Sequence, residues 1–234
     1  MDFNNELLPS VEIVKILPAF SAEEVFAQDK CYLGISLANP VFDKKNLNAL
    51  LLWASANFKQ CLVVIGDDLC RFNQKILYGF GEDECLNVAR ALGDVFIENY
   101  SAVFEQFDAD VITISRWGEH VESDMYRKSR EVIESIFINN SEFRSMVAKD
   151  AVSFVKRQKK HDAEFAVTDD EAIDLCCEYL LEEIAVFNIL SEQGFRVELY
   201  PGSELNALVE VAKGKFPDVP QGLKNRINVE LRIC

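Results

Sequence analysis

No apolar run in this 234-residue sequence approaches the roughly 18 residues that a membrane-spanning helix needs. The segment Met1 to Glu6 lacks the basic and apolar stretches of a secretory signal. The seven cysteines follow no C-x-x-C spacing, and most lie in apolar surroundings. We therefore expect a cytoplasmic protein with no membrane partner and with reduced thiols in its core.

Histidine is scarce, since only His120 and His161 occur and neither lies near a pair of cysteines. A zinc site is therefore not expected, and we predict no metal. The glycine patterns G-x-G-x-x-G and G-x-x-x-x-G-K-[ST] are also missing. Their absence argues against ATP and dinucleotide enzymes of those types, and we predict no cofactor.

Positive charge is in deficit, with 24 basic and 39 acidic residues and a net charge of −15. This balance argues against general coating of nucleic acid, which depends on Lys and Arg. The segment 144–161 is the exception, because its six basic residues and one acid give a local charge of +5, centred on Lys156, Arg157, Lys159 and Lys160. Such a run is either a solvated helix end or a contact for a phosphate backbone.

The remaining pattern predicts one α/β domain over residues 1–234, with a mostly parallel central sheet and helices on both faces. Short runs rich in Val and Ile predict strands at 11–17, 31–36, 61–66, 111–115, 195–200 and 229–233. Helical spacing covers 43–58, 84–107, 117–138, 142–160 and 170–190. Capping-box patterns at Ser21 and Thr168 predict helix starts. In such folds, the site forms at the carboxyl ends of the strands.

A serine stands at the end of the predicted strand 31–36. Ser36 comes close to the G-x-S-x-G nucleophile elbow of α/β-hydrolases, with Ala38 at the last glycine. The elbow needs a helix directly after the serine, whereas Pro40 disfavours helical geometry at Asn39. Taken alone, this stretch favours Ser36 as a plain strand end over a nucleophile.

Polar residues also follow two other strands. Asp67 and Asp68 come after Gly66, and they either bind a metal or an amine or cap the helix that follows. Tyr200 ends the strand 195–200 before a turn. It either reaches into the same crevice or is an ordinary surface tyrosine.

One face of the predicted helix 170–190 combines apolar and polar residues. Cys176, Tyr179, Glu183 and Phe187 share this face by the i, i+3, i+4 rule. A buried carboxylate there needs a cationic partner, and a ligand ammonium is the obvious candidate. The alternative is that Glu183, beside Glu182, borders the solvated face, and the pattern does not separate the two.

Together these residues resemble the cyclodipeptide synthase family over about residues 30 to 201. The resemblance rests on Gly34-x-Ser36-x-x-Asn39, the Leu51-Leu52-Trp53-Ala54 helix, Tyr126, Tyr179-x-x-x-Glu183 with Phe187, and Tyr200. It implies a Rossmann-like fold similar to the catalytic domain of class I tyrosyl- and tryptophanyl-tRNA synthetases. It also implies an aminoacyltransferase that joins amino acids from two aminoacyl-tRNAs into a cyclic dipeptide, a 2,5-diketopiperazine, without ATP, as a monomer or homodimer.

The resemblance also implies a role for each matching residue. Ser36 would take the first aminoacyl group as an ester, and Tyr179 and Glu183 would hold its ammonium. Tyr200 would assist proton transfer during cyclisation. The substrate-binding residues would be Gly34 and Asn39 for positioning, Tyr126 in a supporting hydrogen-bond network, and Tyr32, Val64, Gly66, Trp117, Val186 and Phe187 around the first side chain.

Two features depart from the family's pattern. The family often uses a basic helix earlier in the chain for tRNA, but residues 84–107 offer only Arg90, so our candidate contact is Lys156, Arg157, Lys159 and Lys160. Tyr200-Pro201 is similar to the Tyr-Pro subgroup, whereas Asn39 is more usual in the Tyr-His subgroup.

Two other functions are alternatives to a cyclodipeptide synthase. One is an α/β serine esterase, which needs a histidine such as His161 near Ser36. The other is a non-catalytic aminoacyl-tRNA-binding relative.

Overall fold

The computed structural model describes residues 9–37, 39–160 and 164–234. Over these residues it has one central sheet with the strand order β1-β6-β5-β2-β3-β4. Its strands are β1 (Val11–Leu17), β2 (Lys30–Ile35), β3 (Gln60–Ile65), β4 (Ile112–Arg116), β5 (Val197–Tyr200) and β6 (Ile227–Ile233). Strand β1 pairs antiparallel with β6, and the other neighbours are parallel. The predicted mostly parallel sheet is confirmed.

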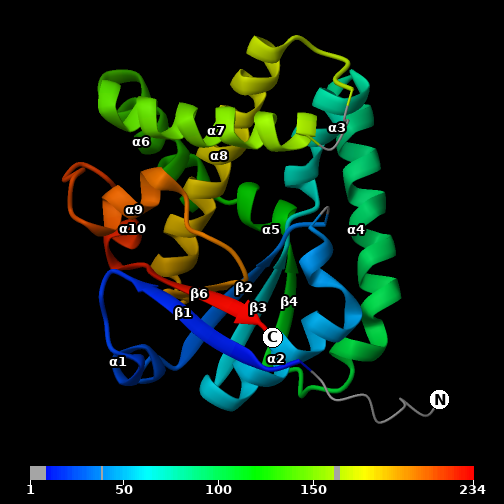
Figure 1. Cartoon of the computed structure of the whole chain (residues 1–234), viewed down its shortest axis with the longest axis vertical. Helices are drawn as coiled ribbons and strands as arrows, with labels where there is room; N and C mark the ends of the chain where they lie inside the picture. Colours follow the sequence, from blue (N-terminus) through cyan, green and yellow to red (C-terminus); the bar gives the residue numbers. More distant parts are fainter. Residues whose placement is uncertain (1–8, 38, 161–163) are drawn as a thin grey trace.

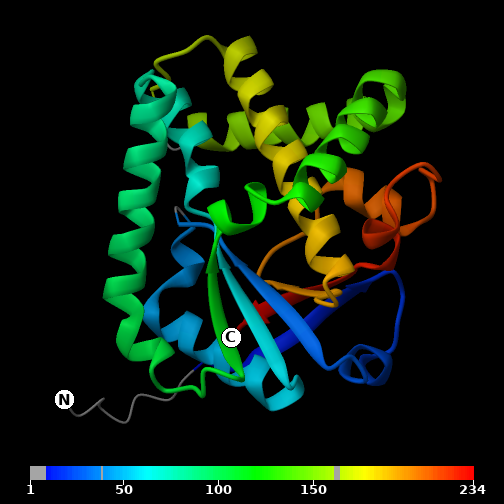
Figure 2. The same ribbon diagram turned by 180° about the vertical axis from the view of Figure 1, so that it is seen from behind.

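Helices cover both faces of the sheet, as predicted (Figures 1 and 2). The helices over one face share an apolar core with Leu33, Val63 and Val197, and those over the other share a core with Tyr32, Leu62 and Val64. The first set includes α2 (Lys44–Asn57) and α4 (Glu82–Phe104). The second includes α6 (Asp124–Asn139), α7 (Ser141–Lys160), α8 (Asp169–Glu192) and α9 (Asn206–Ala212). The shorter helices are α1 (Ala22–Phe26), η1 (Pro40–Phe42), η2 (Asp68–Cys70), α3 (Arg71–Tyr78), α5 (Trp117–Val121) and α10 (Gln221–Asn225).

One predicted helix is divided in the structure, and the two predicted capping boxes differ in outcome. The predicted helix 117–138 is two helices, α5 and α6, because Ser123 leaves helical geometry and accepts a hydrogen bond from the Tyr126 N–H as the N-cap of α6. Ser21 and Glu24 form the predicted capping box. Thr168 caps α8 by accepting from the Glu171 N–H, but the Thr168 N–H does not donate to the Glu171 carboxylate in return.

The described part of the chain holds no helix that is both long and apolar enough to cross a membrane. Six of the seven cysteines are buried free thiols, as predicted for core residues, and Cys234 is exposed.

Candidate active site

A cavity of about 850 Å³ opens at the carboxyl ends of the central strands, where the fold predicts a site. Strands β2, β3 and β5 supply its floor, and α7 and α8 supply much of its wall. It is lined by four residues for which the sequence suggested a catalytic role, namely Ser36, Tyr179, Glu183 and Tyr200. Residues up to 164 positions apart in the sequence therefore share one space.

Ser36 follows directly on β2 and begins a tight turn, in which the Asn39 N–H donates to the Ser36 carbonyl at 3.0 Å. The 3-10 helix η1 starts only at Pro40, so the helix that a hydrolase elbow needs after the serine is missing from the described residues here. Gly66 lies so close to β2 that a Cβ would come within 2.9 Å of the Ile35 carbonyl oxygen. Gly34 leaves open space above the strand, since a Cβ there would meet nothing within 4 Å.

Helix α8 presents Cys176, Tyr179, Glu183 and Phe187 to the cavity, so the interpretation of Glu183 as a residue of the solvated face is wrong. Among the described residues, no side chain or backbone group is paired with the Glu183 carboxylate. Burial raises the pKa of Glu183 to about 7, against a smaller lowering by Arg226. The carboxylate is thus ready to receive a cation or a proton.

The two tyrosines are held in place by their neighbours. The ring of Tyr179 meets Phe72 edge-on with 6.1 Å between ring centroids. Asn39 Nδ2 donates to Tyr200 Oη at 3.4 Å, while Asn39 Oδ1 accepts from the Val41 N–H at 3.1 Å. Burial raises the pKa of both hydroxyls, and the nearby Glu183 raises it further. Both tyrosines therefore carry a proton at neutral pH.

The other expected substrate-binding residues divide into two groups. Gly34, Asn39, Val64, Gly66, Trp117 and Phe187 line the cavity. Tyr32 and Val186 are buried behind its wall, where Tyr32 Oη accepts from Arg226 Nε at 3.0 Å. Tyr126 lies outside the wall too, and its hydroxyl donates to Glu182 Oε2 at 3.4 Å.

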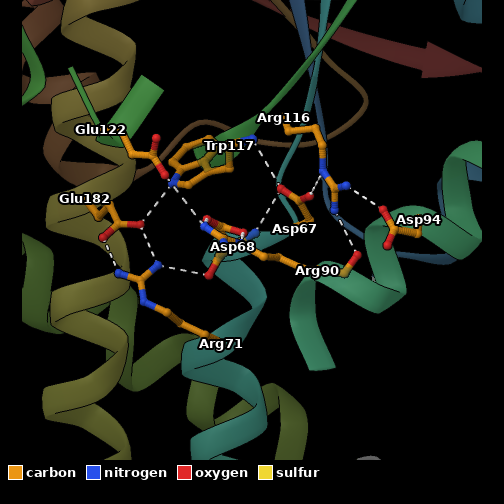
Figure 3. A network of polar contacts seen from close by, with 9 residues as sticks. All are labelled: Asp67, Asp68, Arg71, Arg90, Asp94, Arg116, Trp117, Glu122 and Glu182. Carbon is orange, nitrogen blue, oxygen red and sulfur yellow. Dashed lines mark hydrogen bonds and ion pairs between the residues drawn. The ribbon is translucent and has the colours of Figure 1, made fainter. Parts of the chain in front are cut away.

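Glu182 forms a buried ion pair that the sequence did not reveal. Figure 3 shows its carboxylate between the Arg71 guanidinium and the Trp117 indole. Arg71 Nη1 donates to Glu182 Oε1 at 2.8 Å, Arg71 Nη2 donates to Oε2, and Trp117 Nε1 donates to Oε1 at 2.9 Å. This bidentate contact fixes α8 against α3 and α5, and it orients an indole that lines the cavity.

Asp67 and Asp68 extend the same network toward α4 (Figure 3). The Arg116 Nε donates to Asp67 Oδ2 at 2.5 Å, and the Asp67 side chain also accepts from the Asp68 N–H as the N-cap of η2. Asp68 accepts two hydrogen bonds from Arg90, at 2.9 and 2.8 Å. The capping interpretation therefore holds for Asp67, and both carboxylates contact arginines of the chain itself.

The basic run lies at the end of α7 and reaches the cavity mouth. Arg157 lines the cavity, and the side chains of Lys156 and Lys160 are exposed. Lys159 is already paired with Asp169 at 2.5 Å. Arg90, the basic residue on α4, is held by Asp68.

The described histidine, His120, gives no support to an esterase. His120 is buried, and its Nε2 lies 2.9 Å from Ser115 Oγ, away from the residues that line the cavity. His161 lies outside the described residues, as does Ala38 of the hydrolase-like stretch.

A cluster around Arg226 also escaped the sequence analysis. Arg226 Nη1 donates to Glu204 Oε2 at 2.5 Å, and Arg226 Nη2 donates to Glu198 Oε2. Asn228 Nδ2 donates to the same Glu198 oxygen at 3.0 Å. Glu198, Glu204 and Asn228 line the cavity. Glu198 is the sequence feature that could have indicated this cluster, because it is a charged residue in a strand that is otherwise largely apolar.

Comparison with known proteins connects this geometry to one family. Residues 19–191 match a family model described as cyclodipeptide synthase. No curated protein matches the chain.

Solved structures share the fold at low sequence identity. A cyclodipeptide synthase from Fluoribacter dumoffii has a TM-score of 0.79 at 22% identity, covering 97% of this chain and 98% of that one. A Mycobacterium tuberculosis protein, described as demonstrating that cyclodipeptide synthetases are related to type I tRNA synthetases, scores 0.74 at 14% identity, covering 100% of both chains. A cyclodipeptide synthase from Candidatus Glomeribacter gigasporarum, solved bound to Phe-tRNA, scores 0.64 at 16% identity, covering 88% and 87%. At these identities the likeness concerns the fold.

The adjacent glutamates of α8 should affect stability in opposite directions. Glu182→Gln weakens the contact with Arg71 and should lower the free energy of unfolding by about 1–3 kcal/mol. Glu183→Gln removes a carboxylate without a cationic partner and should raise that free energy by about 1–3 kcal/mol near pH 8. Urea denaturation of both variants measures these changes. Shifts of the same sign would contradict the assignment of the two environments.

The gain from Glu183→Gln should also depend on pH. The unfolded chain loses the Glu183 proton near pH 4.5, whereas the folded chain keeps it to about pH 7. Stability is therefore lost as the pH rises through this window, and the variant is spared this loss. The stability difference between variant and wild type should grow from about pH 4.5 to about pH 7 and then level off. Denaturation curves across the window would refute this if the difference were constant.

Proposed function

The chain belongs to the cyclodipeptide synthase family, and we propose that it joins the aminoacyl groups of two aminoacyl-tRNAs into a cyclic dipeptide through an ester on Ser36. The observation that carries the proposal is the common cavity of Ser36, Tyr179, Glu183 and Tyr200. An aminoacyl ester on tRNA is already activated, so its transfer to a serine hydroxyl needs no ATP.

In the first step, Ser36 Oγ attacks the ester carbonyl of the first aminoacyl-tRNA. The bond from this carbon to Ser36 Oγ forms, the bond to the ribose oxygen breaks, and the serine proton ends on the ribose oxygen. Serine is a weak nucleophile without a strong base. We infer that positioning above Gly34, together with the substrate's ribose hydroxyl, supplies much of the activation.

In the second step, the amine of the Ser36-bound amino acid attacks the ester carbonyl of the second aminoacyl-tRNA. The amine must first lose a proton, and Glu183 holds it as an ammonium and accepts that proton. A carboxyl group with a pKa of about 7 suits this exchange at neutral pH. Tyr179, on the same face of α8, orients the ammonium. The new C–N bond forms, the bond from this carbon to the ribose oxygen of the second tRNA breaks, and the second amine proton ends on that oxygen. A dipeptidyl ester stays on Ser36.

In the third step, the free amine of the dipeptide attacks the ester carbon on Ser36. The new C–N bond closes the six-membered ring, the C–O bond to Ser36 breaks, and the amine proton passes to Ser36 Oγ. Tyr200 assists this transfer, supported by its protonated hydroxyl and its hydrogen bond from Asn39. Tyr126 acts indirectly, through its bond to Glu182.

The exposed Lys156, Arg157 and Lys160 at the end of α7, of which Arg157 lines the cavity, are proposed to contact the tRNA backbone. A phosphate contact beside the reacting ester would help to deliver the acceptor end to Ser36. Lys159 contributes less, because it is paired with Asp169.

Replacement of the nucleophile tests the proposal. Bacteria that express the wild type should release a new cyclic dipeptide, and bacteria that express Ser36→Ala should release none, as measured by mass spectrometry of the medium. Ser135→Ala, at an exposed serine on α6, is the matched control and should keep the product. Product from the Ser36→Ala culture would refute the nucleophile, and product from neither culture would favour a non-catalytic binding protein.

Loss of the basic run should weaken tRNA binding and make the binding less dependent on salt concentration. The triple alanine variant at Lys156, Arg157 and Lys160 should bind aminoacyl-tRNA more weakly, with the slope of log K against log salt reduced by about two. The control replaces three exposed lysines away from the cavity, Lys15, Lys59 and Lys213, and removes the same total charge. Equal losses in both variants would show that net charge, not this site, governs binding.

A further inference from the structure

The cavity has two chemically different halves on either side of β2. The sheet order places β3 on one side of β2 and β5 followed by β6 on the other. The β3 half is largely apolar, with Val64, Leu69, Phe72, Ile76 and Trp117. The β5–β6 half carries Asp150, Glu198, Glu204 and Asn228 instead. Ser36, at the end of β2, lies between the two halves.

Acidic side chains outnumber basic ones in the β5–β6 half. Arg226 serves both Glu198 and Glu204, so one guanidinium is shared between two acids. Asp150 accepts hydrogen bonds from Asn206 Nδ2 at 2.5 Å and from the Ala207 N–H at 3.3 Å. No basic side chain of the described residues forms an ion pair with it. Arg157 is exposed at the mouth. Burial raises the pKa of Glu204 to about 8, and a cation bound in this half would favour the ionised form of this carboxyl group.

Asn228 adds an acceptor that nothing in the described chain satisfies. Its side chain is 3% exposed and lines the cavity. Its Nδ2 group donates to Glu198, but its Oδ1 has no hydrogen-bond partner among the described residues. This amide oxygen faces the cavity and can accept a hydrogen bond from a ligand there. Ammonium and guanidinium groups carry such donors and a positive charge.

The depth of Glu198 indicates which part of a substrate reaches it. Glu198 is in register with Tyr32, four residues before Ser36. At about 3.3 Å per residue, this is roughly 13 Å along the strand. The α-ammonium of a substrate lies next to the reacting ester and stays near Ser36, whereas a long side chain points away from it.

We propose that the β5–β6 half binds one of the two amino-acid side chains, and that this side chain is the cation of a lysine or an arginine. The product would combine one basic and one apolar side chain, the latter held by the β3 half. This inference rests on the proposed function, because it assigns the two sides of the cavity to the two aminoacyl groups.

The test uses the full chain and total tRNA charged with all the standard amino acids. Mass spectrometry of the products should find chiefly cyclic dipeptides with one lysine or arginine and one apolar residue. Reactions with tRNA charged only with lysine or only with arginine, each together with one apolar amino acid, distinguish the two cations. Glu204→Gln should lower the ratio of basic to uncharged products by about tenfold. Glu164→Gln, at an exposed carboxylate, should leave the ratio unchanged.

The ratio is independent of how much variant folds, because misfolding lowers both products together. Cyclic dipeptides with two uncharged side chains, or a ratio that Glu204→Gln leaves unchanged, would overturn the inference and leave the proposed function intact. Absence of any cyclic dipeptide would overturn the proposed function, and this inference with it.

Discussion

The ion pair between Glu182 and Arg71 is the contact on which the site depends. Neighbouring residues of a helix point about 100° apart, so a contact that fixes Glu182 also fixes the direction of Glu183. With Glu182 held by Arg71 and Trp117, the face with Tyr179 and Glu183 is turned toward Ser36. The same contact sets the indole in the apolar half of the cavity. One buried charge pair thus positions both a proposed ammonium site and a wall of the proposed first pocket.

The two adjacent glutamates of α8 lie in opposite environments. The environment of Glu182 stabilises the fold, whereas that of Glu183 suits its proposed function. Glu182 receives hydrogen bonds from Arg71, Trp117 and Tyr126, whereas Glu183 is half-buried without a cation in the described structure and has its pKa raised to about 7. An unpaired buried carboxylate costs stability, and such costs concentrate at functional sites. The α-ammonium of a substrate would supply the missing partner. The same principle extends to Glu198 and Glu204, which share one arginine.

Local patterns predicted the fold and residues that line the cavity at the strand ends, but not long-range pairing. Short Val- and Ile-rich runs predicted all the described strands, and helical spacing predicted the face with Tyr179 and Glu183. The two adjacent glutamates are identical in type, and their environments depend on Arg71, which lies 111 residues from Glu182 in the chain. The break at Ser123 was missed because apolar spacing continues across it. Tyr32 was expected at the cavity surface, but Phe187 and Arg226 cover it.

Acylation of Ser36 is tested most directly by the intact mass of the protein after brief mixing with a single aminoacyl-tRNA. The mass should rise by one aminoacyl group, and peptide mapping should find this group on the segment that contains Ser36. An adduct on another residue, such as Cys176 in the same cavity, would contradict the account. So would cyclic dipeptide formation with no covalent adduct at any time point.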